Sequence, residues 1–348
     1  MKITLVFNPM KLILFLIFPF LLYSCGDSDE ARMQKFLLKG NLALKEQDQA
    51  QAIKYFEEAL KIDPCFADAL NNLGTVAHQE KHFAEAVSYY TKSIACRPKF
   101  LTPYFNRANS YYELKEYYSA QKDVKFLVSQ KPDTSIVYFT QGLIAAKMFD
   151  FKFAIESFDH AIALDSTNTD FRVNRGTVHY YLRQYDEALK DLAVAAQINP
   201  DEPNIYNTRS MIEVAQGEID AALADVQKAL QLSPNHPYFL NNRGYIYLQQ
   251  KKLPEALKDI DQSIVLDSDN AWAFRNKGIY RLMTGDYVNA IRLFEQAIRM
   301  DKFVEKVHFY LGTAYARDGQ QKMACDEFRK SERMGDKMVP AEWLKACR

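Results

Sequence analysis

The chain carries no excess charge of either sign. Lys and Arg together number 44 among its 348 residues, and Asp and Glu also number 44. A protein that binds nucleic acid through its phosphates needs a basic surface, so this balance argues against nucleic acid as a main partner. Cysteine is scarce, with five residues, which excludes a small fold held together by many disulfides. Because 48% of the residues are hydrophobic and 25% charged, the composition is that of a folded chain.

Catalytic motifs are missing as well. The sequence contains no HExxH zinc motif, no P-loop and no G-x-S-x-G nucleophile motif. Only six histidines are present, and no cluster of carboxylates accompanies them to form an acid–base pair. We therefore expect a non-enzymatic protein with no cofactor and no metal site.

The N-terminal region has an almost purely apolar run from Leu12 to Leu22, preceded by Lys2 and Lys11. A transmembrane helix needs about 20 apolar residues, so this run is too short to span a bilayer. A basic start followed by a short apolar stretch predicts an export signal instead. The signal is also complete from Met10, so the sequence leaves the start open between Met1 and Met10.

The residues that end this run resemble the lipobox of bacterial lipoproteins, with Leu22 three residues before Cys25 and Ser24 directly before it. The resemblance implies a signal peptide over 1–24 and a diacylglycerol on the Cys25 sulfur. Two or more acyl chains anchor a protein stably. A plain secretory signal with a chance cysteine is the alternative.

Residues 25–32 would then form a short lipidated tether. Its start, from Gly26 to Glu30, is acidic and resembles the surface-export signal of Bacteroidetes lipoproteins. The resemblances together predict a lipid-anchored protein of the bacterial cell envelope. They place it at the outer membrane, either facing the periplasm or exposed on the cell surface.

From residue 33 onward the chain repeats every 34 residues through nine copies, without insertion or deletion. Position 20 is alanine in every copy, position 8 is glycine, alanine or serine, and position 32 is proline in five copies. Small residues at positions 8 and 20 allow two helices to approach closely, and proline ends the second helix. The copies begin at Met33, Ala67, Leu101, Ser135, Thr169, Pro203, Pro237, Ala271 and Glu305.

This pattern resembles the tetratricopeptide repeat (TPR) family, whose unit is a 34-residue helix-turn-helix. The resemblance implies an all-α fold, a right-handed α-solenoid of nine repeats over 33–338. Solenoids need a cap on their exposed end, and 339–348 is predicted to be a capping helix. The family implies a groove lined by the first helix of each repeat, through positions 2, 5, 9 and 12.

In this chain the groove positions hold aromatic side chains beside amides. Large rigid rings bind peptides at low entropic cost, so the resemblance predicts a peptide-binding groove. Packing of some of these rings on neighbouring helices is the structural alternative. The groove candidates are Asn41, Phe105, Asn109, Tyr112, Phe139, Tyr180, Asn207, Tyr238, Asn241, Tyr245, Trp272 and Phe309.

Positions 7 and 23 vary together. Four copies have arginine at position 7 and the same four have aspartate at position 23, whereas the other five copies have neither. This coupling predicts ion pairs between the two helices of a repeat, with a structural role. The predicted pairs are Arg107–Asp123, Arg175–Asp191, Arg209–Asp225 and Arg243–Asp259.

The cysteines other than Cys25 form two groups. Cys325 lies ten residues before Gly335 and Cys347 twelve after it, so an antiparallel turn at Gly335 would bring them opposite each other. A disulfide there is possible in an oxidising compartment; two free thiols are the alternative. Cys65 and Cys96 lie nearly one repeat apart, and we expect their Cα atoms to be too distant for a bridge.

Two functional hypotheses follow. The first is a scaffold or adaptor lipoprotein that binds a protein or peptide partner in its groove, with its membrane contact made through the lipid on Cys25. The second is a glycan or cell-wall binding module, because exposed Trp and Tyr beside amides also suit sugars. Repeat architecture alone hosts many functions and does not identify the ligand.

Overall fold

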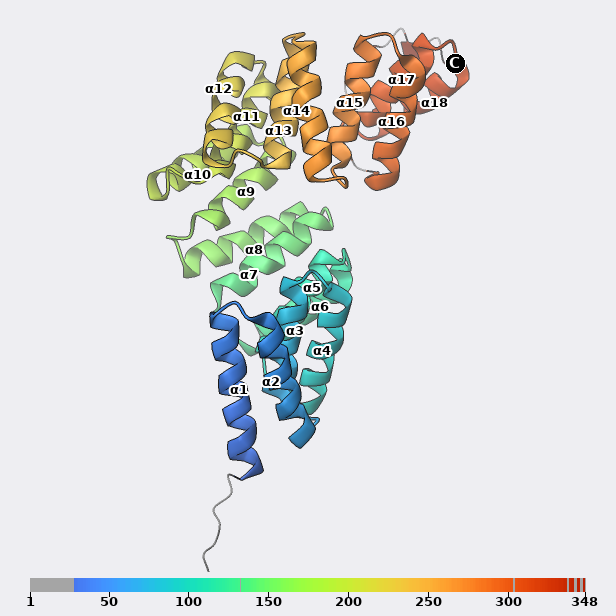
Figure 1. Cartoon of the computed structure of the whole chain (residues 1–348). Helices are drawn as coiled ribbons and strands as arrows, with labels where there is room; N and C mark the ends of the chain where they lie inside the picture. The colour runs from blue at the N-terminus through green and yellow to red at the C-terminus, as the bar shows by residue number, and fades with distance from the viewer. Residues whose placement is uncertain are drawn as a thin grey trace, which may run out of the picture. The chain divides into compact units, whose positions relative to one another are not determined.

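The structure is a computed structural model that describes residues 28–131, 133–302, 304–336, 338–340, 343–344 and 347. The predicted signal peptide, Cys25 and the start of the tether lie outside the described residues. Within the described ranges the regular structure consists of eighteen α-helices, with no β-strand (Figure 1).

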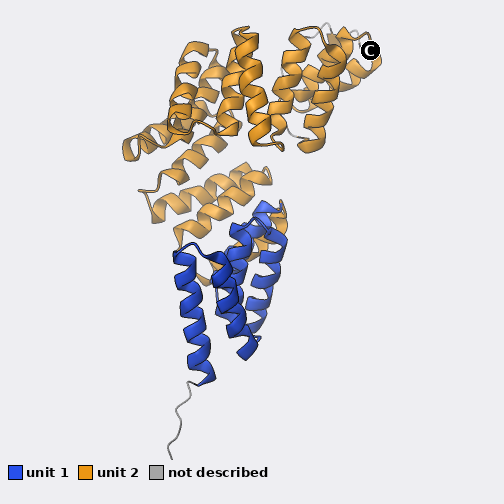
Figure 2. Cartoon of the chain, viewed as in Figure 1, with its two compact units in different colours: residues 1–114 blue, residues 115–348 orange. Residues whose placement is uncertain are grey.

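Two compact units divide the chain between Leu114 and Lys115, as Figure 2 shows. The first unit contains α1 (Asp29–Lys45), α2 (Gln49–Ile62), α3 (Ala67–Gln79), α4 (Phe83–Cys96) and α5 (Thr102–Glu113). The second unit contains α6 (Tyr117–Gln130), α7 (Ser135–Lys147), α8 (Phe151–Leu164), α9 (Thr169–Tyr181), α10 (Tyr185–Ile198), α11 (Pro203–Gln216), α12 (Ile219–Leu232), α13 (Pro237–Gln249), α14 (Leu253–Leu266), α15 (Ala271–Met283), α16 (Tyr287–Met300), α17 (Val307–Arg317) and α18 (Gln321–Arg333).

The turn inside each repeat is built around position 15, which has a left-handed backbone in all nine copies. Glycine fills it in three copies, at Gly217, Gly285 and Gly319. Six copies place a larger residue there with φ between 58° and 64°, a conformation that costs roughly 1–2 kcal/mol outside glycine. The packing of the two helices that this turn connects therefore outweighs the local backbone preference. The six are Gln47, Lys81, Lys115, Phe149, Arg183 and Lys251.

The two helices of a repeat meet where position 8 faces position 24. A Cβ added to Gly278 would lie 2.6 Å from Cε1 of Phe294, and one added to Gly74 would lie 2.6 Å from Cε1 of Tyr90. Both rings are almost completely buried. The missing side chain at position 8 therefore provides the space that the aromatic ring occupies.

In the two copies whose position 8 carries a side chain, the residue at position 24 is a smaller one. Ala108 is matched by Val124 in the third copy, and Ser210 by Val226 in the sixth. Valine is smaller than the phenylalanine or tyrosine found opposite five of the glycines, so the two positions keep their combined volume within bounds. This size matching is a feature that the motif positions alone did not reveal.

The helix pairing confirms the predicted fold class, an all-α solenoid of TPR type. In each described unit, consecutive helices pack as antiparallel hairpins, and from α3 onward the first helices of neighbouring repeats within a unit also contact each other. The second helices make no comparable contact with each other among the described residues. The first helices therefore lie closer together and line the inner side of each unit's stack.

The N-terminal boundary differs from the prediction. The α1 helix begins at Asp29, so Asp29–Arg32 are helical rather than part of an extended tether. The Ser28 hydroxyl oxygen accepts a hydrogen bond from the Ala31 N–H, and two acidic residues occupy the first turn. Both features stabilise a helix N-terminus, so Asp29 and Glu30, which belong to the stretch that resembled an export signal, also favour this helix start.

The predicted capping helix falls partly outside the described residues. Within 339–348, Trp343 and Leu344 are helical and pack against the C-terminal core. The Trp343 ring lies 5.1 Å from the ring of Phe328. The end segment thus covers apolar surface on α18, which is the role expected of a cap.

Candidate functional site

The candidate site is the inner face of the second unit, which we define by the inward side chains of α9, α13, α15 and α17. The predicted groove residues on these helices are Tyr180, Tyr238, Asn241, Tyr245, Trp272 and Phe309. Tyr238 is 46% exposed, whereas Tyr180, Tyr245, Trp272 and Phe309 are partly buried. A neighbour that the sequence reasoning missed, Tyr181, is 45% exposed. The helices of the inner face therefore carry two accessible tyrosines and four partly buried aromatic side chains.

Some predicted groove residues have a packing role instead. The Phe139 ring lies 5.8 Å from the Phe158 ring and 4.9 Å from the Phe171 ring, both of which belong to buried side chains. Phe309 contacts the buried Phe328 ring at 6.4 Å. We therefore assign Phe139 and Phe309 to the hydrophobic core.

In the first unit, the predicted groove residues are Asn41 and three residues of α5. Asn41 is exposed, and its Oδ1 accepts a hydrogen bond of 2.7 Å from Asn72 Nδ2. Phe105, Asn109 and Tyr112 are partly buried. They belong to a different unit from Tyr238 and Trp272, so a groove that joins all twelve residues stays a prediction.

An amide ladder runs along the first helices of the second unit. Asn276 Nδ2 donates to Asn241 Oδ1 at 2.7 Å, Asn241 Nδ2 donates to Asn242 Oδ1 at 3.3 Å, and Asn242 Nδ2 donates to Asn207 Oδ1 at 2.8 Å. Asn207, Asn241 and Asn276 are buried. These amides satisfy one another, as buried polar groups must, so the two predicted groove amides act mainly as a structural ladder.

Arg275 ends this ladder and was also missed by the sequence reasoning. It is buried, and its Nε and Nη2 donate to Asn276 Oδ1 while Nη1 donates to the carbonyl of Glu305 at 2.9 Å. Its guanidinium lies 4.8 Å from the Trp272 ring and 5.1 Å from the Tyr245 ring, a favourable cation–π arrangement. An arginine at position 5, where other copies have apolar or amide residues, was the available signal.

Burial and nearby carboxylates raise the pKa values of the tyrosines on the inner face. Burial raises the pKa of Tyr180 and Tyr181, and the carboxylate of Glu305 raises both further. Burial also raises the pKa of Tyr238 to about 12, with Asp267 as the next cause. Charged residues on the loops before α15 and α17 thus contribute to the raised pKa values of tyrosines on α9 and α13.

Predicted ion pairs between positions 7 and 23 form within the second unit. Arg175 donates to Asp191 through Nε at 2.8 Å and through Nη2 at 2.5 Å. Arg209 pairs with Asp225 through the same two nitrogens. The pair Arg243–Asp259 has distances of 2.6 and 2.8 Å. Such bidentate contacts are the strong form of this interaction.

The remaining predicted pair joins residues of the two different units, and Arg107–Asp123 stays a prediction. Arg107 Nη1 donates to the Thr91 hydroxyl at 3.0 Å within the first unit. The fourth copy replaces the ion pair by a neutral one, in which the Ser157 hydroxyl donates to Gln141 Oε1 at 3.3 Å. Positions 7 and 23 therefore meet even where neither is charged.

Glu213 lies beside one of these pairs and should make stability depend on pH. Burial and the nearby Asp225 carboxylate raise its pKa from 4.5 to about 7, and its buried Oε2 has no hydrogen-bond partner. The folded state therefore holds an extra proton between about pH 4.5 and pH 7. Stability is full below that window and falls as the pH rises through it.

Glu213→Gln removes this loss. As the pH rises from 4.5 to 7.5, the free energy of unfolding of the variant should increase by about 2 kcal/mol relative to that of the wild type, a figure already reduced for the partial exposure of Glu213. Urea unfolding at a series of pH values measures the difference. A constant difference across that range would contradict the assignment.

The structure forms two disulfides, one of which corrects a prediction. Cys65 and Cys96 are bonded, with their Cα atoms 5.3 Å apart, although we expected them to be too distant. Separation along the chain was a poor guide because the end of α4 lies beside the start of α3, where Ser93 Oγ donates to the carbonyl of Ala67 at 2.7 Å. A residue just before the first helix is thus adjacent to the end of the second.

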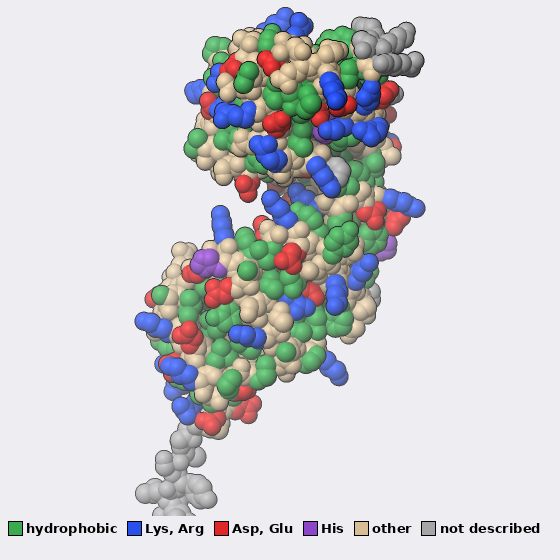
Figure 3. All heavy atoms as spheres, turned by 90° about the vertical axis from the view of Figure 1, so that its right-hand side faces the viewer, with side chains coloured by type: hydrophobic (Ala, Val, Ile, Leu, Met, Phe, Trp, Pro, Cys, Tyr) green, Lys and Arg blue, Asp and Glu red, His purple; other side chains and the backbone are tan. Residues whose placement is uncertain are grey.

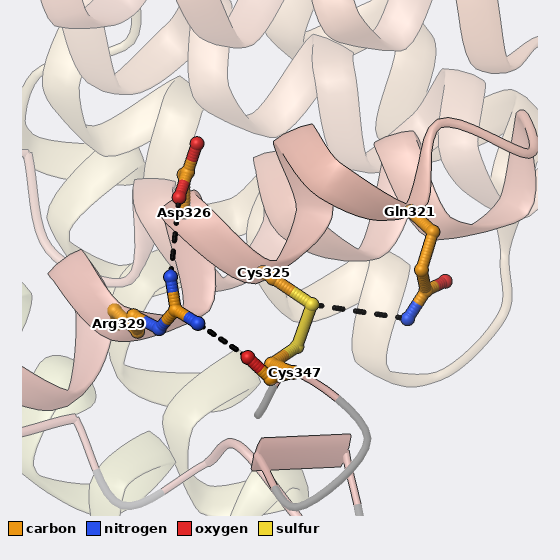
Figure 4. The surroundings of a disulfide bond; sticks show 5 residues. All are labelled: Gln321, Cys325, Asp326, Arg329 and Cys347. Carbon is orange, nitrogen blue, oxygen red and sulfur yellow. Dashed lines mark hydrogen bonds and ion pairs between the residues drawn. A yellow bond between two sulfur atoms is a disulfide. The ribbon is translucent and has the colours of Figure 1, made fainter.

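The other disulfide joins Cys325 on α18 to Cys347, with Cα atoms 5.2 Å apart. Figure 4 shows Arg329 between Asp326 and the backbone carbonyl of Cys347, to which it donates a hydrogen bond. The disulfide links the C-terminal segment covalently to α18. Closure of a loop of this length stabilises a fold by about 3 kcal/mol in the chain-entropy model.

Thiol counting tests both disulfides. The full chain should gain four alkylation sites when it is reduced under denaturing conditions, because four of its five cysteines are paired. Mass spectrometry after iodoacetamide treatment measures the gain. A gain of two sites would show that only one of the two disulfides forms.

Charges on the surface are mixed. Figure 3 shows Lys and Arg side chains interspersed with Asp and Glu and with apolar side chains over the face in view. Among the described residues no group of three His, Cys, Asp or Glu could hold a metal ion. No described helix has the length and apolar character that crossing a bilayer requires.

Together, these hairpins define an all-α repeat protein with a period of 34 residues. A TPR repeat family model matches residues 212–251, and a tetratricopeptide repeat model matches residues 37–99. The small glutamine-rich tetratricopeptide repeat-containing protein 2 of Saccharomyces cerevisiae is 34% identical over 77 residues. That match covers 22% of this chain and 22% of the yeast protein, so it spans about a fifth of the relative's length.

Two solved structures share the fold. A chain of the APC/C hetero-tetramer Cut9–Hcn1 has a TM-score of 0.63 at 17% identity, over 92% of this chain and 64% of that chain. This chain therefore spans just under two thirds of that one. Pseudomonas aeruginosa pilF has a TM-score of 0.52 at 21% identity, over 61% of this chain and 96% of that chain. The chain belongs to the tetratricopeptide repeat family.

Proposed function

We propose that this protein is a non-enzymatic, lipid-anchored scaffold that binds a segment of a partner protein on the inner face of its second unit. The observation that carries the proposal is that Tyr181 and Tyr238 are accessible, whereas Trp272 and Tyr245, which belong to the same set of helices, are partly buried. Accessible aromatic groups backed by a rigid layer are typical of protein-binding sites.

Export of the chain is supported by its cysteine chemistry. The two disulfides fit an oxidising compartment outside the cytoplasm. They account for four of the five cysteines, and the fifth is Cys25, the residue of the lipobox. A short apolar signal followed by one cysteine outside the disulfides is consistent with a lipoprotein of the outer membrane, facing the periplasm or the exterior.

The amide ladder favours a protein partner over a glycan. A sugar site would need the amides of Asn207 and Asn241 for its hydroxyl groups, yet both amides are buried and bonded to neighbouring asparagines. The exposed rings still suit sugar stacking, so the glycan module remains the second candidate. Binding to isolated peptidoglycan separates the two.

Capture from envelope extract tests the proposal with a matched control. The double variant Tyr181→Ala/Tyr238→Ala removes the accessible rings, whereas Tyr118→Ala removes a ring that is 80% exposed on α6. A partner captured by the wild type and by Tyr118→Ala, and lost from the double variant, supports the inner face. Equal capture by all three proteins would place binding elsewhere. Circular dichroism confirms that each variant is folded.

A further inference from the structure

We propose that a groove lined by α8, α9 and α10 binds an aspartate or glutamate side chain of a partner protein, and that Arg172 receives its carboxylate. The groove has a volume of about 450 Å³, which is in the range of ligand sites. Its lining includes none of the aromatic or amide side chains of the inner face, so the proposal goes beyond the function proposed above. It rests on an arginine without a hydrogen bond, on carboxylates that are already engaged, and on the charge of the lining.

Arg172 occupies the fourth position of the fifth repeat, where most copies carry a large apolar or aromatic side chain. In the sixth repeat this residue is Tyr206, whose ring lies 5.4 Å from the Arg209 guanidinium. In the fifth repeat a second guanidinium takes the place of that ring, on the same helix as Arg175. The residues at position 4 are Phe36, Leu70, Tyr104, Tyr138, Arg172, Tyr206, Leu240, Phe274 and His308. The fifth repeat therefore has a charge where its neighbours have a packing residue.

The Arg172 guanidinium makes no hydrogen bond with the described residues. Its Nε is buried and has no partner, and its Nη1 lies 4.0 Å from Asp191 Oδ1, which is too far for a hydrogen bond. The side chain is 18% exposed, so water replaces few of these missing contacts. A largely buried guanidinium without acceptors destabilises a fold, and a carboxylate that enters the groove would supply them.

The carboxylates that line the groove are engaged by other cations. Asp191 accepts hydrogen bonds from Nε and Nη2 of Arg175, and Asp159 accepts one from Nη1 of the same guanidinium at 2.5 Å. Glu187 accepts a hydrogen bond of 2.9 Å from Lys190. These three pairings leave the guanidinium at position 4 as the group in the groove that an external acceptor would complete.

The charges of the lining cancel. Three cationic side chains face three carboxylates there, on Arg172, Arg175, Lys190, Asp159, Glu187 and Asp191. A dianionic phosphate group would add two negative charges to a neutral lining, whereas a carboxylate adds one and still forms a bidentate contact with a guanidinium. The apolar side chains of Ile155 and Val194 also line the groove, and they suit the methylene stem of an acidic side chain. The lining therefore favours aspartate or glutamate over a phosphoryl group.

A peptide library selected on the immobilised full chain provides the test. Short peptides with blocked ends are randomised around one scanned position, where we expect aspartate and glutamate to be enriched over asparagine and glutamine. Arg172→Leu copies Leu240 of the seventh repeat and should reduce that enrichment at least about tenfold, because a charge-assisted bidentate contact is lost. Glutamate with both backbone ends blocked should compete more strongly than inorganic phosphate at equal concentration.

Two further variants serve as controls. Arg299→Leu removes an exposed arginine from the last turn of α16, outside the groove, and it should leave the acidic enrichment unchanged. Tyr181→Ala/Tyr238→Ala should also leave it unchanged, so that the groove and the inner face are tested separately. Arg172→Leu should keep or raise the melting temperature, because it removes a charge that lacks a hydrogen-bond partner among the described residues.

The inference is overturned if the wild type selects no acidic residue, or if Arg172→Leu selects acidic residues as strongly as the wild type. Stronger competition by phosphate than by the blocked glutamate would contradict the choice of a carboxylate. Arg172→Tyr, which copies Tyr206 of the sixth repeat, repeats the measurement with a larger side chain. If both substitutions at this position lower the melting temperature markedly, the guanidinium serves the stability of the fold and the inference fails.

Discussion

Replacing Asp191 by asparagine should lower the free energy of unfolding by about 3 kcal/mol, because it leaves a largely buried guanidinium without its bidentate partner. The side chain of Asp191 is 6% exposed and that of Arg175 is 20% exposed. Asp159 lies 2.5 Å from Arg175 but is half exposed, so it offsets only part of the loss. Hydrogen exchange of α9 and α10, together with urea unfolding, measures the effect.

The fourth repeat supplies the matched double variant. Gln141 and Ser157 occupy the same two positions there and form a neutral hydrogen bond. Arg175→Gln/Asp191→Ser copies that pair, and it should cost less than Asp191→Asn alone because the Arg175 guanidinium is no longer left without its bidentate partner. If the double variant is the less stable of the two, the ion pair contributes more than the penalty of breaking it. A cycle with both single variants gives the coupling energy directly.

These pairs show which contacts a repeat sequence can predict. Nine aligned copies compare one structural position with itself, so arginine and aspartate that occur together indicate contact without any structure. The Cys65–Cys96 bond has no such copies, because each cysteine occurs at its position once. The separation of the two cysteines along the chain was therefore a misleading guide, because antiparallel packing places the start of α3 beside the end of α4.

The inner face was predicted less well for a related reason. The family positions identified Tyr238, Tyr245 and Trp272, but position alone cannot tell a ring that packs, such as Phe139, from one that is open. Exposure depends on the size of neighbours in adjacent repeats. The role of Arg275 depends on Tyr245 of α13, Trp272 of α15 and the Glu305 carbonyl in the loop before α17, an arrangement that no single-repeat pattern contains.

Replacing Gly278 by alanine should destabilise the eighth repeat by about 2 to 3 kcal/mol, although alanine is the better helix former by about 1 kcal/mol. The added Cβ would lie 2.6, 2.8 and 3.0 Å from three ring atoms of Phe294. That ring is fully buried and rests against the Tyr310 ring at 6.1 Å, so it has little room to move. Thermal and urea unfolding measure the loss.

Gly176→Ala is the matched control at the same repeat position. There the nearest side-chain atoms to an added Cβ are 3.5 and 3.6 Å away and the nearest backbone oxygen is at 3.3 Å, so the change should stay within about 1 kcal/mol of neutral. Pairing Gly278→Ala with Phe294→Val copies the alanine–valine combination of the third repeat. The double variant should cost at least about 1 kcal/mol less than the sum of its single changes, because each relieves the packing defect of the other. Strict additivity would show that position 8 and position 24 do not share one volume, and that the glycines serve the helix backbone alone.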